Sequence, residues 1–116
     1  MTNLVYVGRF APSPTGPLHF GSLVAALASY LDAKANGGRW LVRIEDLDPP
    51  REVTGSSTLI LNQLQALGMK WDDDVLYQST RLGAYERMLQ QLENREYCFN
   101  CDCSRQRVSG LKGVYD

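Results

Sequence analysis

The first part of the chain alternates between the apolar spacing of a strand and that of a helix. The short apolar run Leu4-Val5-Tyr6-Val7-Gly8 predicts a strand over about residues 4 to 8. After a turn, side chains recur at helical spacing with alanines between them: Leu23, Leu27, Tyr30, Leu31 and Lys34. Asn36-Gly37-Gly38 is expected to end this helix, because Gly and Asn tolerate the left-handed conformation that follows a helix.

A second strand follows directly. Trp40, Val42 and Ile44 alternate with Leu41 and Arg43. Strand, helix and strand in this order predict a right-handed crossover and a parallel sheet, and therefore an α/β fold. The next segment, residues 45–51, contains two consecutive prolines that exclude helix and central strand. We expect it to be a loop at the carboxyl end of the second strand.

The remaining pattern predicts two more helices. A helix from about Ser57 to Leu67 places Ile60, Leu64 and Leu67 on one face, with Gly68 just after it. Residues 71–74 are polar and turn-like, and residues 75–78 are extended. Ser79 or Thr80 would cap a third helix. Its apolar face would consist of Leu82, Tyr85, Leu89 and Leu92. The segment from residue 97 to residue 116 is expected to be irregular.

Composition and charge narrow the function classes only slightly. The 116 residues are 44% hydrophobic and 22% charged, which is ordinary for one globular domain. The net charge of −1 provides no overall electrostatic attraction for nucleic acid. It does not exclude a basic patch on one face, because net charge says nothing about how the charges are distributed. No apolar run reaches the length of a membrane span, and no secretory signal is visible. We expect a cytoplasmic protein with no membrane partner.

The turn between the first strand and the first helix is the strongest candidate for chemistry. Residues 9–22 combine three prolines, two glycines, hydroxyls and His19, the only histidine of the chain. A turn of this kind places backbone N–H groups and a helix N-terminus where an anionic phosphate can bind. Thr15 and His19 are placed to donate hydrogen bonds to phosphate oxygens. A purely structural proline-rich turn is the alternative reading, and these residues alone leave it open.

Two separated segments resemble one family. The residues Arg9-Phe10-Ala11-Pro12-Ser13-Pro14-Thr15-Gly16 and Leu18-His19-Phe20-Gly21-Ser22 are similar to the HIGH signature region of class I glutamyl-type aminoacyl-tRNA synthetases. The segment Leu41-Val42-Arg43-Ile44-Glu45-Asp46-Leu47-Asp48 resembles their next strand and loop. His-Phe-Gly-Ser, Asp48-Pro49-Pro50-Arg51-Glu52 and the Cys101-Asp102-Cys103 tail favour the short branch of the family that acts on queuosine in tRNA(Asp).

The resemblance implies a reaction and a fold. The fold would be the first half of a Rossmann-like catalytic domain over residues 1–96, followed by the start of a zinc-binding insertion over residues 97–116. ATP, with Mg²⁺, would activate L-glutamate to glutamyl-adenylate, and the glutamyl group would pass to queuosine in the anticodon of tRNA(Asp). The full-length proteins are expected to be monomers.

The resemblance also assigns roles to residues. Arg9 would bind the side-chain carboxylate of glutamate, and Glu45 would bind its ammonium group. The residues between them in the substrate site would be Phe10, Ala11, Pro12 and Ser13. The ATP site would consist of Thr15, Gly16, His19, Gly21 and Ser22, with His19, Thr15 and Ser22 acting on the reacting phosphate.

Judged from the residues alone, Arg9 would be a surface cation and Glu45 would form an ion pair with Arg43 or Arg51. Ser22 replaces the second histidine of the wider class signature, so it supplies no positive charge.

Zinc ligands are also implied. The family pattern assigns Cys101, Cys103 and Tyr115 to the metal, with a fourth cysteine that would lie just beyond Asp116. Cys98 is a substitute, and three free thiols are the alternative.

The second Rossmann half and the lysine-bearing loop of the family are missing from these residues. We therefore expect a truncated member with little activity of its own. The competing hypotheses are the N-terminal part of a conventional glutamyl-tRNA synthetase and a non-catalytic nucleotide-binding remnant.

Overall fold

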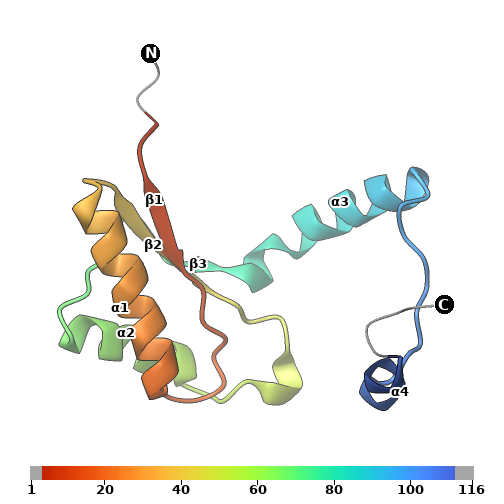
Figure 1. The fold of residues 1–116 in the computed structure, drawn as a ribbon, viewed down its shortest axis with the longest axis horizontal. Helices are drawn as coiled ribbons and strands as arrows, with labels where there is room; N and C mark the ends of the chain where they lie inside the picture. Colours follow the sequence, from red (N-terminus) through yellow and green to blue (C-terminus); the bar gives the residue numbers. More distant parts are fainter. Residues whose placement is uncertain (1–3, 112–116) are drawn as a thin grey trace. The chain divides into compact units, whose positions relative to one another are not determined.

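A computed structural model describes residues 4–111 of the chain. The chain divides into two compact units, Met1–Leu82 and Gly83–Asp116. The first unit contains the sheet and the helices that cover it (Figure 1). The second contains nearly all of one long helix, α3 (Leu82–Asn94), and a short one, α4 (Arg105–Gly110). Within residues 4–111, no helix is long and apolar enough to cross a membrane.

The sheet has three parallel strands in the order β1-β2-β3. They are β1 (Val7–Phe10), β2 (Arg39–Ile44) and the very short β3 (Leu76–Tyr77). Gly8 lies opposite Trp40, and Ile44 lies opposite Tyr77. The parallel strand-helix-strand unit predicted at the start of the chain is therefore confirmed. The helix that connects the first two strands is α1 (Phe20–Ala35), and Asn36 is its C-cap, so the helix ends where Asn36-Gly37-Gly38 predicted.

The prediction of β1 over residues 4 to 8 was wrong at both ends. Leu4 and Val5 are exposed, at 94% and 62%, and they lie outside the strand. The pairing with β2 starts at Val7 because β2 itself starts at Arg39. Phe10, which the apolar run did not include, belongs to the strand and is buried in the core.

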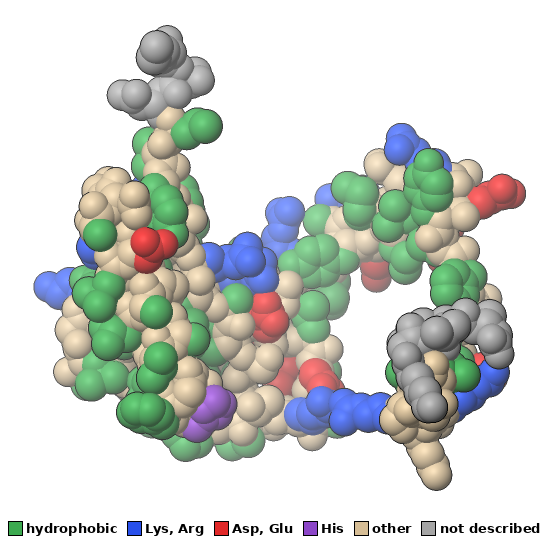
Figure 2. All heavy atoms as spheres, viewed as in Figure 1, with side chains coloured by type: hydrophobic (Ala, Val, Ile, Leu, Met, Phe, Trp, Pro, Cys, Tyr) green, Lys and Arg blue, Asp and Glu red, His purple; other side chains and the backbone are tan. Residues whose placement is uncertain are grey.

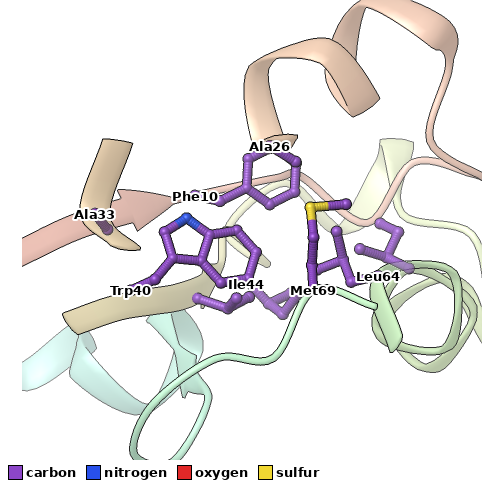
Figure 3. Close-up of a cluster of buried hydrophobic side chains, with 9 residues drawn as sticks. Phe10, Ala26, Ala33, Trp40, Ile44, Leu64 and Met69 are labelled. Atoms are coloured by element: carbon purple, nitrogen blue, oxygen red, sulfur yellow. The ribbon is translucent and has the colours of Figure 1, made fainter. Parts of the chain in front are cut away.

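The core lies where α1, α2 (Ser56–Ala66) and the sheet meet (Figure 3). Trp40, Val42 and Ile44 point to it from alternate positions of β2, as the strand period requires. The remaining buried members come from β1, the two helices and the segment after α2: Phe10, Ala26, Ala33, Ile60, Leu64 and Met69. The Phe10 and Trp40 rings are stacked with their centroids 6.4 Å apart.

Helix α1 packs through its alanines and not through the leucines that predicted it. Ala26 and Ala33 are completely buried, whereas Leu27 and Leu31 are 46% and 54% exposed. Small side chains let the helix backbone approach the sheet, and at Gly8 an added Cβ would lie 3.1 Å from the Ala33 Cβ and 3.2 Å from the Ser29 carbonyl oxygen. The helix was predicted correctly, but its buried face was not.

Helix α2 agrees with its prediction to within one residue at each end. Ile60 and Leu64 are buried as expected, but Leu67 is exposed. The segment before α2, expected to be a loop, contains a single 3₁₀ turn, η1 (Pro49–Arg51). Prolines are tolerated there because the first N–H groups of a helix have no intrahelical partner in any case.

Helix α3 (Leu82–Asn94) begins after the 3₁₀ turn η2 (Gln78–Arg81) and has no buried residue. Neither expected cap contacts the helix start, since the Ser79 hydroxyl donates to Asp46 and the Thr80 hydroxyl donates to the Tyr77 carbonyl. The tail, predicted to be irregular, contains α4 (Arg105–Gly110). Its start is capped by Ser104, whose Oγ accepts from the Arg107 N–H at 3.2 Å.

Candidate functional site

Residues 11–19, the signature turn, connect β1 to α1. This turn leaves the sheet at the carboxyl end of β1, and Glu45 follows the carboxyl end of β2. Because β1 and β2 are parallel, these two segments meet at one edge of the sheet. The Glu45 N–H donates to the Pro12 carbonyl at 2.9 Å, which joins them directly.

A cleft of about 330 Å³ lies along the signature turn. Most of the residues assigned from the family pattern line it: Phe10, Ala11, Pro12, Ser13, Thr15, Gly16, His19 and Ser22. Arg9, Gly21 and Glu45 are not among its lining residues. The structure therefore brings together the larger part of the predicted site.

Helix α2 fixes the signature turn through two polar side chains. The Ser56 hydroxyl accepts from the Gly16 N–H at 2.8 Å and donates to the Gly16 carbonyl at 2.9 Å. The Gln63 Oε1 accepts from the Leu18 N–H at 2.9 Å. Sequence reasoning missed both residues, because nothing in the helical pattern says which loop a polar side chain will meet. The Val53 N–H adds a further bond to the Pro14 carbonyl, at 3.0 Å.

His19 is the N-cap of α1. Its Nδ1 accepts from the Ser22 N–H at 3.1 Å, and its Nε2 lies 2.9 Å from the Ser22 Oγ. The imidazole is exposed at the surface of the first unit, where it is the only purple side chain in Figure 2. At Gly21, an added Cβ would lie 3.1 Å from the His19 Cε1, so a larger residue would displace the ring. This arrangement places an imidazole, a hydroxyl and the amide N–H groups of a helix start together, which suits an anionic phosphate.

Glu45 is ion-paired with Arg43, whose Nη2 lies 2.7 Å from its Oε1. This is one of the two ion pairs that the residues alone suggested, whereas Arg51 pairs with Asp48 instead, at 3.1 Å. The Arg43 Nε is buried without a hydrogen-bond partner within the described residues. Arg9 alternates with the inward-facing Gly8 and Phe10, so it lies on the other face of the sheet beside Leu41. It is exposed, and no ion pair of Arg9 occurs within residues 4–111.

Asp46 ties the loop after β2 to the turn after β3. Its carboxylate accepts from the Ser79 N–H at 2.8 Å and from the Ser79 hydroxyl at 2.6 Å. Partial burial by itself raises the pKa of Asp46, but these hydrogen bonds outweigh burial and hold the pKa below its ordinary value. The ionised Asp46 carboxylate therefore links the loop after β2 to the turn after β3.

The cysteines do not assemble a complete metal site in the part of the chain that the structure describes. The Cys103 backbone N–H donates to the Cys101 sulfur, and this bond, followed by one from the Cys103 thiol, lowers the pKa of Cys101. The same thiol bond to Cys101 raises the pKa of Cys103. Across residues 4–111, no three His, Cys, Asp or Glu side chains are grouped to hold a metal ion, so the substitute set with Cys98 is not assembled there. Tyr115 lies outside the described residues. The sulfurs of Cys101 and Cys103 could supply two of the four ligands that a closed zinc site needs.

Comparison with known proteins decides the family. A family model described as "tRNA synthetases class I (E and Q), catalytic domain" matches residues 5–114. The chain belongs to this family. Membership confirms the resemblance that residues 9–22 and 41–48 suggested. It also confirms the fold class as the N-terminal, Rossmann-like part of a class I synthetase catalytic domain.

Individual synthetases of this family are similar over nearly the whole chain. Proteins named glutamyl-Q tRNA(Asp) synthetase are 59% identical over 111 residues in Shewanella oneidensis and 56% identical over 116 residues in Escherichia coli K12. The crystal structure of a glutamate tRNA ligase from Elizabethkingia meningosepticum, in complex with its amino acid, is 36% identical with a TM-score of 0.72.

The chain is much shorter than these synthetases. It covers 37% of the Shewanella protein, 38% of the Escherichia protein and 23% of the Elizabethkingia ligase. Each match in turn includes 92% or more of this chain. Because the chain covers less than half of each relative, the activity of the whole protein is a proposal.

Proposed function

We propose that this chain is the part of a glutamyl-Q-type synthetase that binds ATP and L-glutamate. The whole protein would activate glutamate to glutamyl-adenylate and transfer the glutamyl group to queuosine in the anticodon of tRNA(Asp). The observation that carries the proposal is the cleft along the signature turn, which is lined by residues of the HIGH-type segment and opens at the carboxyl edge of a parallel sheet. The relatives at 56–59% identity are named glutamyl-Q tRNA(Asp) synthetase, which favours queuosine-bearing tRNA(Asp) as the acceptor.

The ATP side of the site would consist of Thr15, Gly16, His19, Gly21 and Ser22. His19 would stabilise the charge that develops on the α-phosphate, with the Ser22 hydroxyl and the first N–H groups of α1 beside it. Mg²⁺ would accompany ATP and neutralise part of its charge. Gly21 would keep space for the imidazole, since a Cβ there would contact the ring.

The glutamate side would consist of Arg9, the segment of Phe10, Ala11, Pro12 and Ser13, and Glu45. The Arg9 guanidinium is free of ion pairs within residues 4–111, so it is available for the substrate's side-chain carboxylate. Glu45 would bind the ammonium group, and Arg43 would hold the Glu45 carboxylate in place from the side. Arg9, one residue before the carboxyl end of β1, and Glu45, directly after β2, would bind the two ends of the amino acid.

Activation is an in-line attack of the substrate's α-carboxylate on the α-phosphate, with pyrophosphate leaving. No protein nucleophile is needed, so the task of the residues is to position the two substrates and stabilise charge. The held signature turn suits that task, because its carbonyl and N–H groups are bonded from β2, α2 and the segment between them.

We further propose that Cys101, Cys103 and Tyr115 belong to a zinc site whose remaining ligand comes from outside these residues, in an insertion that starts near residue 97. The protein would be a cytoplasmic monomer. Zinc content measured on the purified protein, and on Cys101→Ser, tests the metal assignment. Equal zinc content in the two would contradict it.

Glutamate-dependent exchange of pyrophosphate into ATP tests the activation step. The protein that carries this chain is expected to exchange only with glutamate, and to charge queuosine-bearing tRNA(Asp) but not tRNA(Glu). Charging of tRNA(Glu) alone would instead establish a conventional glutamyl-tRNA synthetase. ATP binding without exchange would establish a non-catalytic remnant.

A further inference from the structure

Helix α2 contacts the signature turn through the same side that it buries in the core. Ser56, Ile60 and Gln63 are four and seven positions apart, which places them on one face of the helix. Ile60 is completely buried in the core, and Ser56 is 2% exposed. The face that anchors α2 therefore also presents two polar groups to the turn.

These polar groups bond the turn at Gly16, within the proposed ATP side, and at Leu18, next to His19. Gly16, held through both its N–H and its carbonyl, has a φ of +135°, a conformation that L side chains rarely adopt. Leu18, whose N–H is held by Gln63, directly precedes His19. Its position therefore sets where the imidazole and the start of α1 lie.

We infer that Gln63, assisted by Ser56, is a positioning residue for the nucleotide. It holds the signature turn in the conformation that presents His19 and the α1 N-terminus to the phosphates of ATP. The inference rests on the proposed function of the turn. The glutamate segment is bonded separately, by the Glu45 N–H at the Pro12 carbonyl, and the Val53 N–H bonds the Pro14 carbonyl just after it. Loss of the Gln63 bond should therefore affect ATP more than glutamate.

Gln63→Met tests this, because it removes the acceptor and keeps a side chain of similar length. The KM for ATP in the exchange reaction is expected to rise about three- to tenfold, the effect of one lost hydrogen bond, with the KM for glutamate changed less than twofold. Gln63→Glu keeps an oxygen acceptor for the Leu18 N–H and should restore most of the ATP affinity. Gln65→Met is the matched control, since Gln65 is exposed on the same helix.

A purely structural role predicts a different result. If the role were purely structural, Gln63→Met would lower the unfolding temperature and raise the KM values for ATP and glutamate to the same extent. Gln63→Glu would then not restore the affinity for ATP selectively. That result, or equal ATP affinity in Gln63→Met and Gln65→Met, overturns the inference. If Gln63→Met fails to fold, Ser56→Ala against Ser57→Ala repeats the comparison at Gly16.

Amide hydrogen exchange separates this inference from the proposed function. The Leu18 N–H is expected to be protected in the unmodified protein and in Gln65→Met, and to exchange at least tenfold faster in Gln63→Met. If the unmodified protein shows no glutamate-dependent exchange, the proposed function fails, and the Leu18 amide still reports whether Gln63 holds the turn. Unchanged protection in Gln63→Met would overturn the inference regardless of activity.

Discussion

At the residue scale, the charged side chains of the candidate site differ in whether they already pair with other residues of the chain. Within residues 4–111, Arg9 has no ion pair and the His19 ring bonds only to Ser22, in the helix cap. Glu45 is different, because Arg43 already pairs with it. A substrate ammonium group would join this existing pair, in which the Arg43 Nη2 lies 2.7 Å from the Glu45 Oε1.

Glu45→Gln is the residue-scale prediction. The amide keeps the shape of the side chain but loses the charge that would attract an ammonium group. The KM for glutamate in pyrophosphate exchange is expected to rise by about one to two orders of magnitude, which corresponds to the loss of a charge-assisted hydrogen bond. The KM for ATP should change little. Glu86→Gln, on the exposed helix α3, is the control. Equal effects of Glu45→Gln on both substrates would contradict the assigned role.

At the element scale, periodicity predicted which helices and strands exist better than it predicted how they pack. The parallel strand-helix-strand unit and α2 follow from apolar spacing, because that spacing directly reflects one buried face. The buried face of α1 was missed since close approach to Gly8 selects alanines over leucines. Short elements such as η1 and α4 depend on prolines and a serine cap that carry no apolar period.

The candidate site divides in the same way. The lining residues of the cleft lie in one contiguous segment, so the sequence alone could indicate them. Ser56 and Gln63 could not be predicted, because they lie some 40 residues further on and reach the turn only through the packing of α2. Long-range polar contacts of this kind require the tertiary structure.

The bond between Asp46 and Ser79 gives the element-scale prediction. Ser79→Ala removes the hydroxyl that donates to the carboxylate, and at pH 7 the free energy of unfolding is expected to fall by about 1 kcal/mol. The folded-state pKa of Asp46 is lowered, so its stabilisation is complete above the unfolded pKa, near 3.8, and is lost as pH falls through the folded value. The difference between Ser79→Ala and the unmodified protein should therefore shrink in acid.

Denaturant unfolding at pH 7 and below pH 4 measures this difference. Thr58→Ala, at an exposed position of α2, serves as the control and should have a small effect at both pH values. A destabilisation by Ser79→Ala that is independent of pH would show that the hydroxyl acts on something other than the ionised carboxylate.

At the scale of the whole molecule, the two units bury apolar side chains to very different degrees. The first unit has a contiguous core, whereas α3 has no buried residue. Its large apolar side chains are 38–56% exposed: Leu82, Tyr85, Met88, Leu89 and Leu92. An apolar helix face that is this exposed favours association with another surface.

Leu89→Lys is expected to reduce self-association of the 116-residue chain, because it places a charge in the middle of this exposed face. Its unfolding temperature should change little, since Leu89 is 50% exposed and contributes no core contact. Gln90→Lys adds the same charge at the next position, where the side chain bonds to Asn94. Light scattering over a concentration series distinguishes the two. Equal association in both variants would show that net charge, and not the apolar face of α3, controls how the chains associate.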